Sequence, residues 1–129
     1  MGVKEGRDVK ILTIDDSAIM RKIIINGLAE TELKAEFCEA ANGEEALKQV
    51  INNPDLTIVL CDLVMPIMNG IEFIETFRRN NVHVPVIMFT TEGSIQKMTE
   101  AIDKGANDYV IKPFTSDDLY EKIVNQAGL

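Results

Sequence analysis

The sequence predicts an α/β protein made of one doubly wound domain, in which a parallel sheet carries helices on both faces. Two observations lead to this prediction. Five short apolar runs, four of them rich in β-branched residues, alternate with longer segments whose apolar residues recur every three or four positions. The chain has 129 residues, the usual size of one domain, and shows no repeat or linker-like segment. Alternating strands and helices imply parallel strands with right-handed crossovers. We therefore expect a single domain over residues 1–129, with no output domain.

The five apolar runs give the expected strands, and all are short, as strands are. Runs 56–61 and 84–89 are apolar at almost every position, which is typical of strands that helices bury on both faces. The expected strands are 9–14, 35–39, 56–61, 84–89 and 109–111.

Most of the predicted helices begin at a residue whose side chain can accept a hydrogen bond from the free N–H groups of the first turn. These residues are Ser17, Asn42, Ser94 and Ser116, while Asn69-Gly70 precede the third helix. Gly105 is expected to close the fourth helix. The residues expected to face the sheet are Met20, Ile23, Ile24, Gly27 and Leu28; Ala46, Leu47, Val50 and Ile51; Ile71, Ile74 and Phe77; Ile95, Met98, Ala101 and Ile102; and Leu119, Ile123 and Val124 or Ala127.

The charge balance excludes several classes of function. Thirteen Lys and Arg residues against 21 Asp and Glu residues give a net charge of −8. Nucleic-acid phosphates and anionic lipids repel such a chain, so we expect it to bind no nucleic acid and to enter no membrane. No apolar run approaches the roughly 18 residues of a membrane span, and residues 1–10 show no signal-peptide pattern. Cys38 and Cys61 form no spacing motif, which favours a reduced, cytoplasmic location.

Polar residues stand where four of the five expected strands end. Asp15-Asp16 follow the first strand, Asp62 the third, Thr90-Thr91 the fourth and Lys112 the fifth. Because parallel strands share one carboxyl edge, where ligands of such sheets bind, we expect these side chains to face one crevice. Three neighbouring carboxylates repel one another unless a cation lies among them. Without a nearby pair of His or Cys residues, the expected cation is Mg²⁺ rather than zinc.

Asp62 ends an apolar strand, where a lone carboxylate needs a partner or a function. Beside Mg²⁺ and opposite Lys112, it can act as a nucleophile toward phosphorus and form an aspartyl phosphate. The ammonium of Lys112 would neutralise phosphate oxygens, and the Thr90 hydroxyl would donate a hydrogen bond to one of them. Simpler roles stay open: Asp15 or Asp16 as a helix cap, Thr90 as an ordinary strand residue, and Lys112 as a surface lysine.

These residues belong to motifs by which the chain resembles the receiver domains of response regulators, most of all the single-domain chemotaxis regulators. The resemblance covers the chain from about Val9 onward and implies a flavodoxin-like sheet with the strand order 2-1-3-4-5. The matching motifs are Ile14-Asp15-Asp16-Ser17 with Met20-Arg21, Cys61-Asp62, Met65-Pro66-Ile67-Met68-Asn69-Gly70, Phe89-Thr90-Thr91-Glu92-Gly93, Gly105-Ala106-Asn107-Asp108-Tyr109 and Lys112-Pro113-Phe114.

The resemblance implies a role for each residue of the crevice. Asp62 would be the phosphoacceptor, receiving a phosphoryl group from the phosphohistidine of a kinase, and Lys112 would contact that group. Mg²⁺ would be held by Asp15, Asp16 and Asp62, together with the backbone carbonyl of Val64. Asp16 would bind the ion directly and Asp15 largely through water.

The resemblance also implies a switch that changes a protein-binding face. The Thr90 hydroxyl and the Tyr109 ring would respond to phosphorylation, and the responding face would be the fourth helix, fifth strand and fifth helix, residues 94–126. The partners would be a sensor histidine kinase, a downstream target such as a flagellar motor switch protein, and a phosphatase. The bond between Lys112 and Pro113 would be a cis peptide.

Val64 separates the chain from the chemotaxis regulators, which carry an amide at this position, so the phosphoryl lifetime does not follow from the resemblance. The alternative function is an aspartyl-phosphate phosphohydrolase, but such an enzyme needs a second acid where Val64 stands. A flavin- or nucleotide-binding module would need a phosphate-binding loop in place of Asp15-Asp16. We therefore expect a signalling protein, not an enzyme, whose own chemistry is phosphoryl uptake and self-dephosphorylation.

Overall fold

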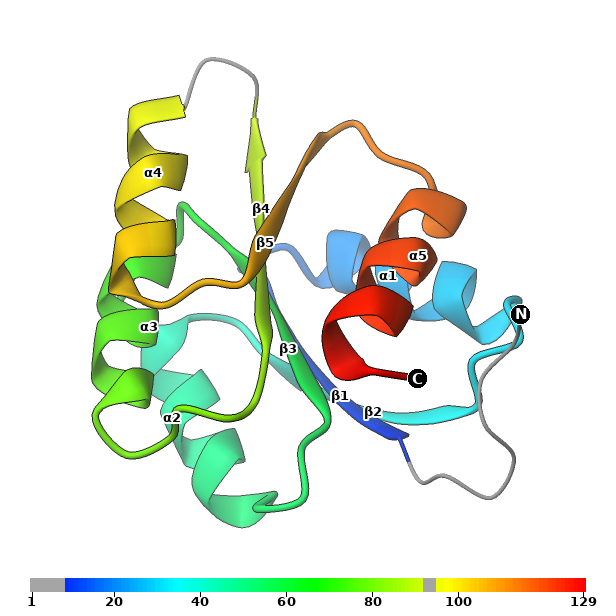
Figure 1. Ribbon diagram of the computed structural model, residues 1–129, viewed down its shortest axis with the longest axis horizontal. Coiled ribbons are helices and arrows are strands. Elements are labelled where there is room, and N and C mark those ends of the chain that lie inside the picture. Colours follow the sequence, from blue (N-terminus) through cyan, green and yellow to red (C-terminus); the bar gives the residue numbers. More distant parts are fainter. Residues whose placement is uncertain (1–8, 92–94) are drawn as a thin grey trace.

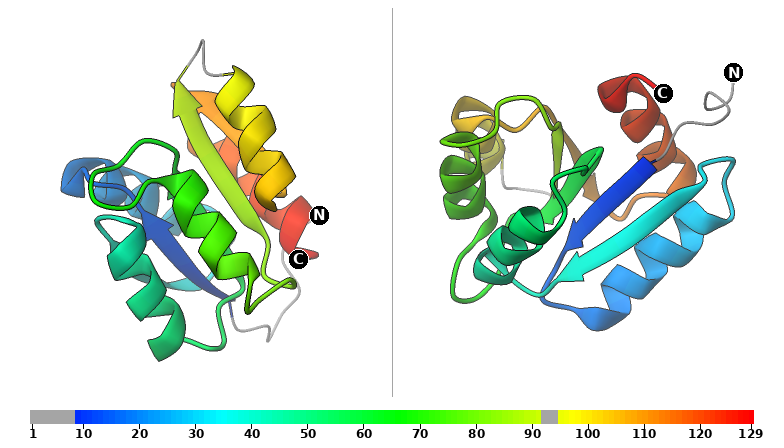
Figure 2. Two further views of the ribbon diagram at one scale, coloured as in Figure 1. Left: turned by 90° about the vertical axis from the view of Figure 1, so that its left-hand side faces the viewer. Right: turned by 90° about the horizontal axis from the view of Figure 1, so that it is seen from below.

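The computed structural model describes residues 9–91 and 95–129, which form a parallel sheet between two layers of helices (Figure 1). The elements are β1 (Val9–Ile14), α1 (Ala18–Ala29), β2 (Ala35–Ala40), α2 (Gly43–Asn52), β3 (Ile58–Asp62), α3 (Gly70–Arg78), β4 (Val86–Thr91), α4 (Ile95–Lys104), β5 (Asp108–Lys112) and α5 (Ser116–Ala127). The strand order β2-β1-β3-β4-β5 confirms the predicted fold class. α2, α3 and α4 cover one face of the sheet, and α1 and α5 cover the other, as Figure 2 also shows.

Strands β3 and β4 begin and end later than the apolar runs that predict them. Pro85 lacks an N–H group and precedes β4, while its carbonyl accepts a hydrogen bond from Val59 at 3.0 Å. Leu56 and Val84 are apolar because they pack in the core outside the strands. The shift places Asp62 inside β3, where it pairs with Phe89 of β4.

Alternate strand residues point into two separate cores, one on each face of the sheet. All five residues of β3 are buried, which confirms the burial on both faces that its apolar run predicts. One core includes Leu12, Val59, Cys61, Phe73, Ile74 and Met88 and lies under α2, α3 and α4. The other includes Ile11, Leu28, Leu60, Ile87, Phe89 and Leu119 and lies under α1 and α5. Among the described helices, none combines the length and the apolar character that crossing a membrane requires.

Local sequence determines where most of the described helices begin. Ser17 accepts from the N–H of Met20, and Asn42 and Asn69 cap α2 and α3 as expected. The predicted cap Ser94 lies outside the described residues. The prediction of Ser116 as the cap of α5 is wrong, because Thr115 is the cap. Thr115 forms a reciprocal capping box with Asp118, three residues along the helix, and Ser116 therefore becomes the first helical residue.

Three aliphatic residues expected to face the sheet are exposed instead. Ile23 of α1, Ile51 of α2 and Ile102 of α4 keep 58%, 78% and 42% of their surface exposed. Each lies at the edge of the apolar face of its helix, and this face is wider than the area that packs against the sheet. Their neighbours Ile24, Ala46 and Ala101 are buried, so the inward direction of each helix is as expected.

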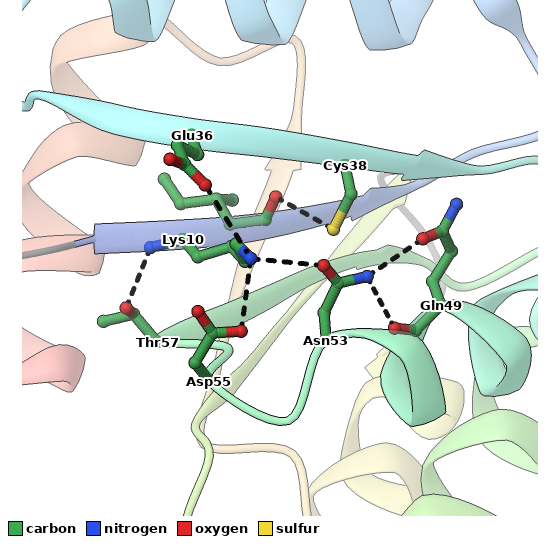
Figure 3. Close-up of polar contacts among 8 residues, drawn as sticks. Lys10, Glu36, Cys38, Gln49, Asn53, Asp55 and Thr57 are labelled. Atoms are coloured by element: carbon green, nitrogen blue, oxygen red, sulfur yellow. Dashed lines mark hydrogen bonds and ion pairs between the residues drawn. The ribbon is translucent and has the colours of Figure 1, made fainter.

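A polar cluster joins three segments near the start of β1 (Figure 3). The ammonium of Lys10 lies 3.2 Å from Asp55 Oδ1, 3.3 Å from Asn53 Oδ1 and 3.7 Å from Glu36 Oε2. The backbone N–H of Lys10 donates to Thr57 Oγ1 at 2.9 Å. The hydrogen bond with Asp55 is the main reason that the pKa of Lys10 is raised. This cluster ties β2 and the segment before β3 to the amino end of β1, opposite the edge where the strands end.

Gly70, the first residue of α3, packs closely against the backbone of Asp62 at the end of β3. A Cβ at Gly70 would lie 2.5 Å from the backbone oxygen of Asp62, whereas the three atoms nearest to a Cβ at Gly43 all belong to the side chain of Met68. We predict that Gly70→Ala lowers the free energy of unfolding by about 1–3 kcal/mol, because the backbone of β3 cannot move aside as a side chain can. Urea unfolding measures the effect, with Gly43→Ala as the matched control. An equal or larger loss in Gly43→Ala would contradict the prediction.

Candidate functional site

The carboxyl edge of the sheet brings the predicted polar residues together. Asp15 follows β1, Asp62 ends β3 and Lys112 ends β5. Lys112 Nζ lies 3.3 Å from Asp62 Oδ2 and 3.7 Å from Asp15 Oδ2. One carboxylate oxygen from each of Asp15, Asp16 and Asp62 lies within 4.8 Å of the others. The expected convergence of three acids and one lysine is therefore confirmed.

Asp15 is the most enclosed acid of this cluster, with 1% of its surface exposed. Its N–H donates to the carbonyl of Ala40 at the end of β2, at 3.0 Å. Its Oδ1 accepts from the N–H of Ser17 at 2.9 Å. Its Oδ2 is buried without a hydrogen-bond partner among the described residues and faces the Lys112 ammonium at 3.7 Å. A buried carboxylate oxygen that accepts no hydrogen bond can serve as a ligand for a cation.

Burial raises the pKa of Asp15, and the negative charges of Asp62 and Asp16 raise it further. The N–H of Ser17 and the ammonium of Lys112 act in the opposite direction without cancelling the effect of burial. The site thus holds more negative charge than its own groups neutralise. A bound cation would stabilise the ionised form of Asp15.

The donor set fits a hard cation. The three groups offer carboxylate oxygens alone, which is the ligand type of Mg²⁺ and Ca²⁺. Cys61, the nearest thiol in sequence, is fully buried in the core and its Sγ lies 3.2 Å from the backbone oxygen of Asp62. The thiol therefore does not add a soft ligand to the cluster.

The segment between β3 and α3 shapes the open side of the site. The N–H of Leu63 donates to the carbonyl of Phe89, and the carbonyl of Leu63 accepts from the N–H of Gly70, both at 3.0 Å. Beyond Leu63, the side chains of Val64 and Ile67 are exposed. Ile67 has a φ of 67°, and the N–H of Met68 donates across it to Pro66 at 2.7 Å, which makes a γ-turn. A β-branched residue rarely adopts this φ, so sequence patterns did not reveal the turn.

Thr90 is buried within β4, and its hydroxyl lies 3.3 Å from the carbonyl of Thr91. In the adjacent strand its register partner is Ile111, while Tyr109 pairs with Met88. Tyr109 is half-exposed, so its ring lies outside the core. The bond between Lys112 and Pro113 is a cis peptide, as the resemblance implies.

Lys122 of α5 contacts both Asp108 and the ring of Tyr109. Its Nζ lies 3.0 Å from Asp108 Oδ1 and 5.8 Å from the centre of the Tyr109 ring. Gln126 donates to the other oxygen of Asp108 at 3.3 Å. Sequence patterns missed this cluster because its members come from two elements. Each is ordinary on its own.

Arg21 is a further residue to which the sequence patterns gave no role. Its side chain extends from α1 to the backbone carbonyl of Asp15 and to the carboxylate of Glu39. It stands in a motif that carries the resemblance, but the sequence alone does not show that the guanidinium contacts the backbone of a site residue.

Comparison with known proteins places these residues in context. Residues 11–124 match the response regulator receiver domain family. Chemotaxis protein CheY1 of Helicobacter pylori is 38% identical over 89% of this chain and 94% of its own length. A chemotaxis protein CheY homologue of Campylobacter jejuni is 37% identical over 93% of each chain.

Solved structures agree with the sequence comparison. A CheY-like receiver domain protein of Methanospirillum hungatei superposes with a TM-score of 0.84 at 27% identity and 95% coverage of both chains. Chemotaxis protein CheY4 of Vibrio cholerae gives a TM-score of 0.82 at 29% identity, over 92% of this chain and 98% of its own.

The raised pKa of Asp15 leads to a prediction about stability. The folded protein binds a proton on Asp15 more readily than the unfolded chain does, so this contribution to stability is lost as pH rises from the ordinary value of 3.8 through the raised pKa. In EDTA at pH 7, Asp15→Asn should raise the free energy of unfolding by about 1–3 kcal/mol, because it removes a buried carboxylate whose Oδ2 has no hydrogen-bond partner among the described residues.

The same gain should shrink as pH falls toward the ordinary value of 3.8, because the raised pKa of Asp15 lets the folded wild type take up this proton at a higher pH than the unfolded chain does. Urea unfolding across this range measures it, with Glu121→Gln on the exposed side of α5 as the control. A difference that is independent of pH, or equal in both variants, would show that burial of the Asp15 charge is not its cause.

Proposed function

Because the chain belongs to the response regulator receiver domain family, with chemotaxis regulators among its relatives, we propose that it is a phosphorylation switch in which Asp62 is the phosphoacceptor. We propose that the domain takes in the whole of residues 1–129. The observation that carries the proposal is the position of the Asp62 carboxylate, with Lys112 Nζ at 3.3 Å and two further acids alongside. A nucleophile, a fixed cation and a site for a second cation meet at one point.

In the proposed reaction, an oxygen of Asp62 attacks the phosphorus of a phosphohistidine on a partner kinase. A P–O bond forms as the P–N bond breaks, and the imidazole nitrogen keeps the bonding electrons and takes up a proton. Lys112 would neutralise one phosphoryl oxygen, and the Thr90 hydroxyl would turn from Thr91 to donate to another.

Asp15, Asp16 and Asp62 would hold Mg²⁺, with the backbone carbonyl of Val64 as a further ligand. The buried Oδ2 of Asp15, which lacks a hydrogen-bond partner among the described residues, supports this assignment. When bound, the ion supplies positive charge to the phosphoryl oxygens in the transition state.

We propose that the protein signals and does not turn over a substrate. A phosphohydrolase would use an acid two residues after Asp62 to protonate a leaving group, and the residue there is Val64. The exposed Val64 side chain adjoins the site and would affect access of water and of a phosphatase to the aspartyl phosphate. A cytoplasmic location remains a prediction.

The proposed output is a change in the face made by α4, β5 and α5, which would bind a target such as a flagellar motor switch protein. Movement of the Thr90 hydroxyl toward the phosphoryl group would vacate space for the Tyr109 ring. Lys104 and Lys122 of this face already pair with Glu75 and Asp108. An acidic segment of the target would therefore have to compete with these carboxylates for the two lysines.

Asp62→Asn tests the proposed acceptor. With acetyl phosphate and Mg²⁺, the wild type should gain one phosphoryl group that hydroxylamine removes, and Asp62→Asn should gain none because an amide is not a nucleophile of this kind. Intact mass spectrometry measures the gain, and Asp103→Asn on the exposed side of α4 should label as the wild type does. Labelling of Asp62→Asn to the wild-type level would rule out the assignment.

Tyr109 should report the switch. Beryllofluoride, a phosphoryl mimic, should shift the ring resonances of Tyr109 in NMR spectra, because the ring turns from its half-exposed position toward β4. Phe73 is fully buried in α3, outside the responding face, and its ring resonances serve as the internal control. Unchanged Tyr109 resonances at full beryllofluoride occupancy would remove Tyr109 from the switch.

A further inference from the structure

Arg21 connects three segments at the carboxyl edge of the sheet. It lies in the first half of α1, and its side chain is 16% exposed. Its Nε donates to Glu39 Oε1 at 2.8 Å, and its Nη1 donates to the backbone carbonyl of Asp15. Glu39 is the residue before Ala40, whose carbonyl accepts the N–H of Asp15. Arg21 therefore fixes the segment that follows β1 against the end of β2.

These bonds leave Asp15 with little freedom. Its N–H, its carbonyl and its Oδ1 are held by Ala40, Arg21 and Ser17 in turn. Only Oδ2 lacks a hydrogen bond among the described residues, and it lies on the side of Asp62 and Lys112. The bond from Arg21 is the one among the three that comes from a long side chain, and it is also the one that substitution can remove without changing the backbone.

We propose that Arg21 is a positioning residue for the cation site. The inference rests on the proposed function, since it assumes that Asp15 helps to hold Mg²⁺. Arg21 does not touch the ion or the phosphoryl group. It acts through the Asp15 carbonyl, which sets the direction in which the Asp15 carboxylate points. Groups that orient metal ligands in this way typically change metal affinity about 10–100-fold when they are removed.

Charge alone predicts the opposite result. Arg21 is a cation close to a cation site, so its removal should tighten Mg²⁺ binding if only long-range repulsion mattered. The carboxylate of Glu39 at 2.8 Å offsets part of that positive charge. The direction of the change in affinity therefore separates positioning from electrostatics.

Lysine is an informative replacement at this position. The guanidinium presents several N–H groups in one plane and reaches Glu39 and Asp15 at once, whereas an ammonium is a single point with a shorter reach. Arg21→Lys keeps the charge and the helix propensity while it loses the paired geometry.

Isothermal titration of the full chain with MgCl₂ tests the proposal, in the wild type, Arg21→Met, Arg21→Lys and the control Lys22→Met. Lys22 is exposed on the same helix and forms no hydrogen bond or ion pair with the residues that the structure describes, so its loss removes one charge alone. We expect Mg²⁺ affinity to fall about 10-fold in Arg21→Met, to fall by a smaller factor in Arg21→Lys, and to stay or rise slightly in Lys22→Met.

A second measurement separates positioning from a general loss of stability. Phosphoryl uptake from acetyl phosphate should be slow in Arg21→Met at low Mg²⁺ and should approach the wild-type rate at saturating Mg²⁺. A variant that unfolds more easily in EDTA but binds Mg²⁺ as Lys22→Met does would overturn the proposal. If Arg21→Met does not fold, Arg21→Lys decides, and wild-type affinity in that variant also overturns it. Absence of Mg²⁺ binding in the wild type would reject the proposed cation site itself, and this inference with it.

Discussion

Repulsion among the carboxylates of Asp15, Asp16 and Asp62 is the interaction around which the carboxyl edge of this protein is organised. Their oxygens lie within 4.8 Å of one another, and Asp15 is almost fully buried. Water cannot solvate such a group well, and burial accordingly raises the pKa of Asp15. Lys112 is the one cation that reaches both Asp15 and Asp62 among the described residues, and it does so from β5, two strands away from β3. One lysine thus faces three carboxylates, which leaves the cluster with excess negative charge. Such a cluster suits a site that takes up a cation and a phosphoryl group.

The backbone around the acids is held more tightly than the open side of the site. Gly70 allows α3 to begin against the backbone of Asp62, and Leu63 is fixed by hydrogen bonds to β4 and to α3. Arg21 and Ala40 hold the opposite acid, Asp15. By contrast, Val64 and Ile67 extend into solvent. A nucleophile in a fixed position beside an accessible rim suits a reaction whose donor is a group on another protein.

The Tyr109 side of the molecule is built differently. The Tyr109 ring is half-exposed and lies near Lys122, whose stronger partner is the carboxylate of Asp108. The Tyr109 ring is half-exposed and the ion pair of Lys122 with Asp108 is only partly buried, so two arrangements of this surface can lie close in free energy. The acidic edge and the aromatic face are joined through the parallel pairing of β4 and β5.

The sequence by itself determined the fold class, the strand order through resemblance, and the polar residues of the site. Strand–helix alternation and apolar runs depend on short-range periodicity, which one chain displays directly, and the parallel topology then forces Asp15, Asp62 and Lys112 to one edge. Only the tertiary structure decided the rest. In the folded protein Ile51 is exposed, Thr115 rather than Ser116 caps α5, and β4 begins after Pro85. The tertiary structure also brings Arg21 to the carbonyl of Asp15. These outcomes depend on how far the sheet extends under each helix and on which backbone groups meet across elements, and neither quantity is encoded by the local pattern of residue types.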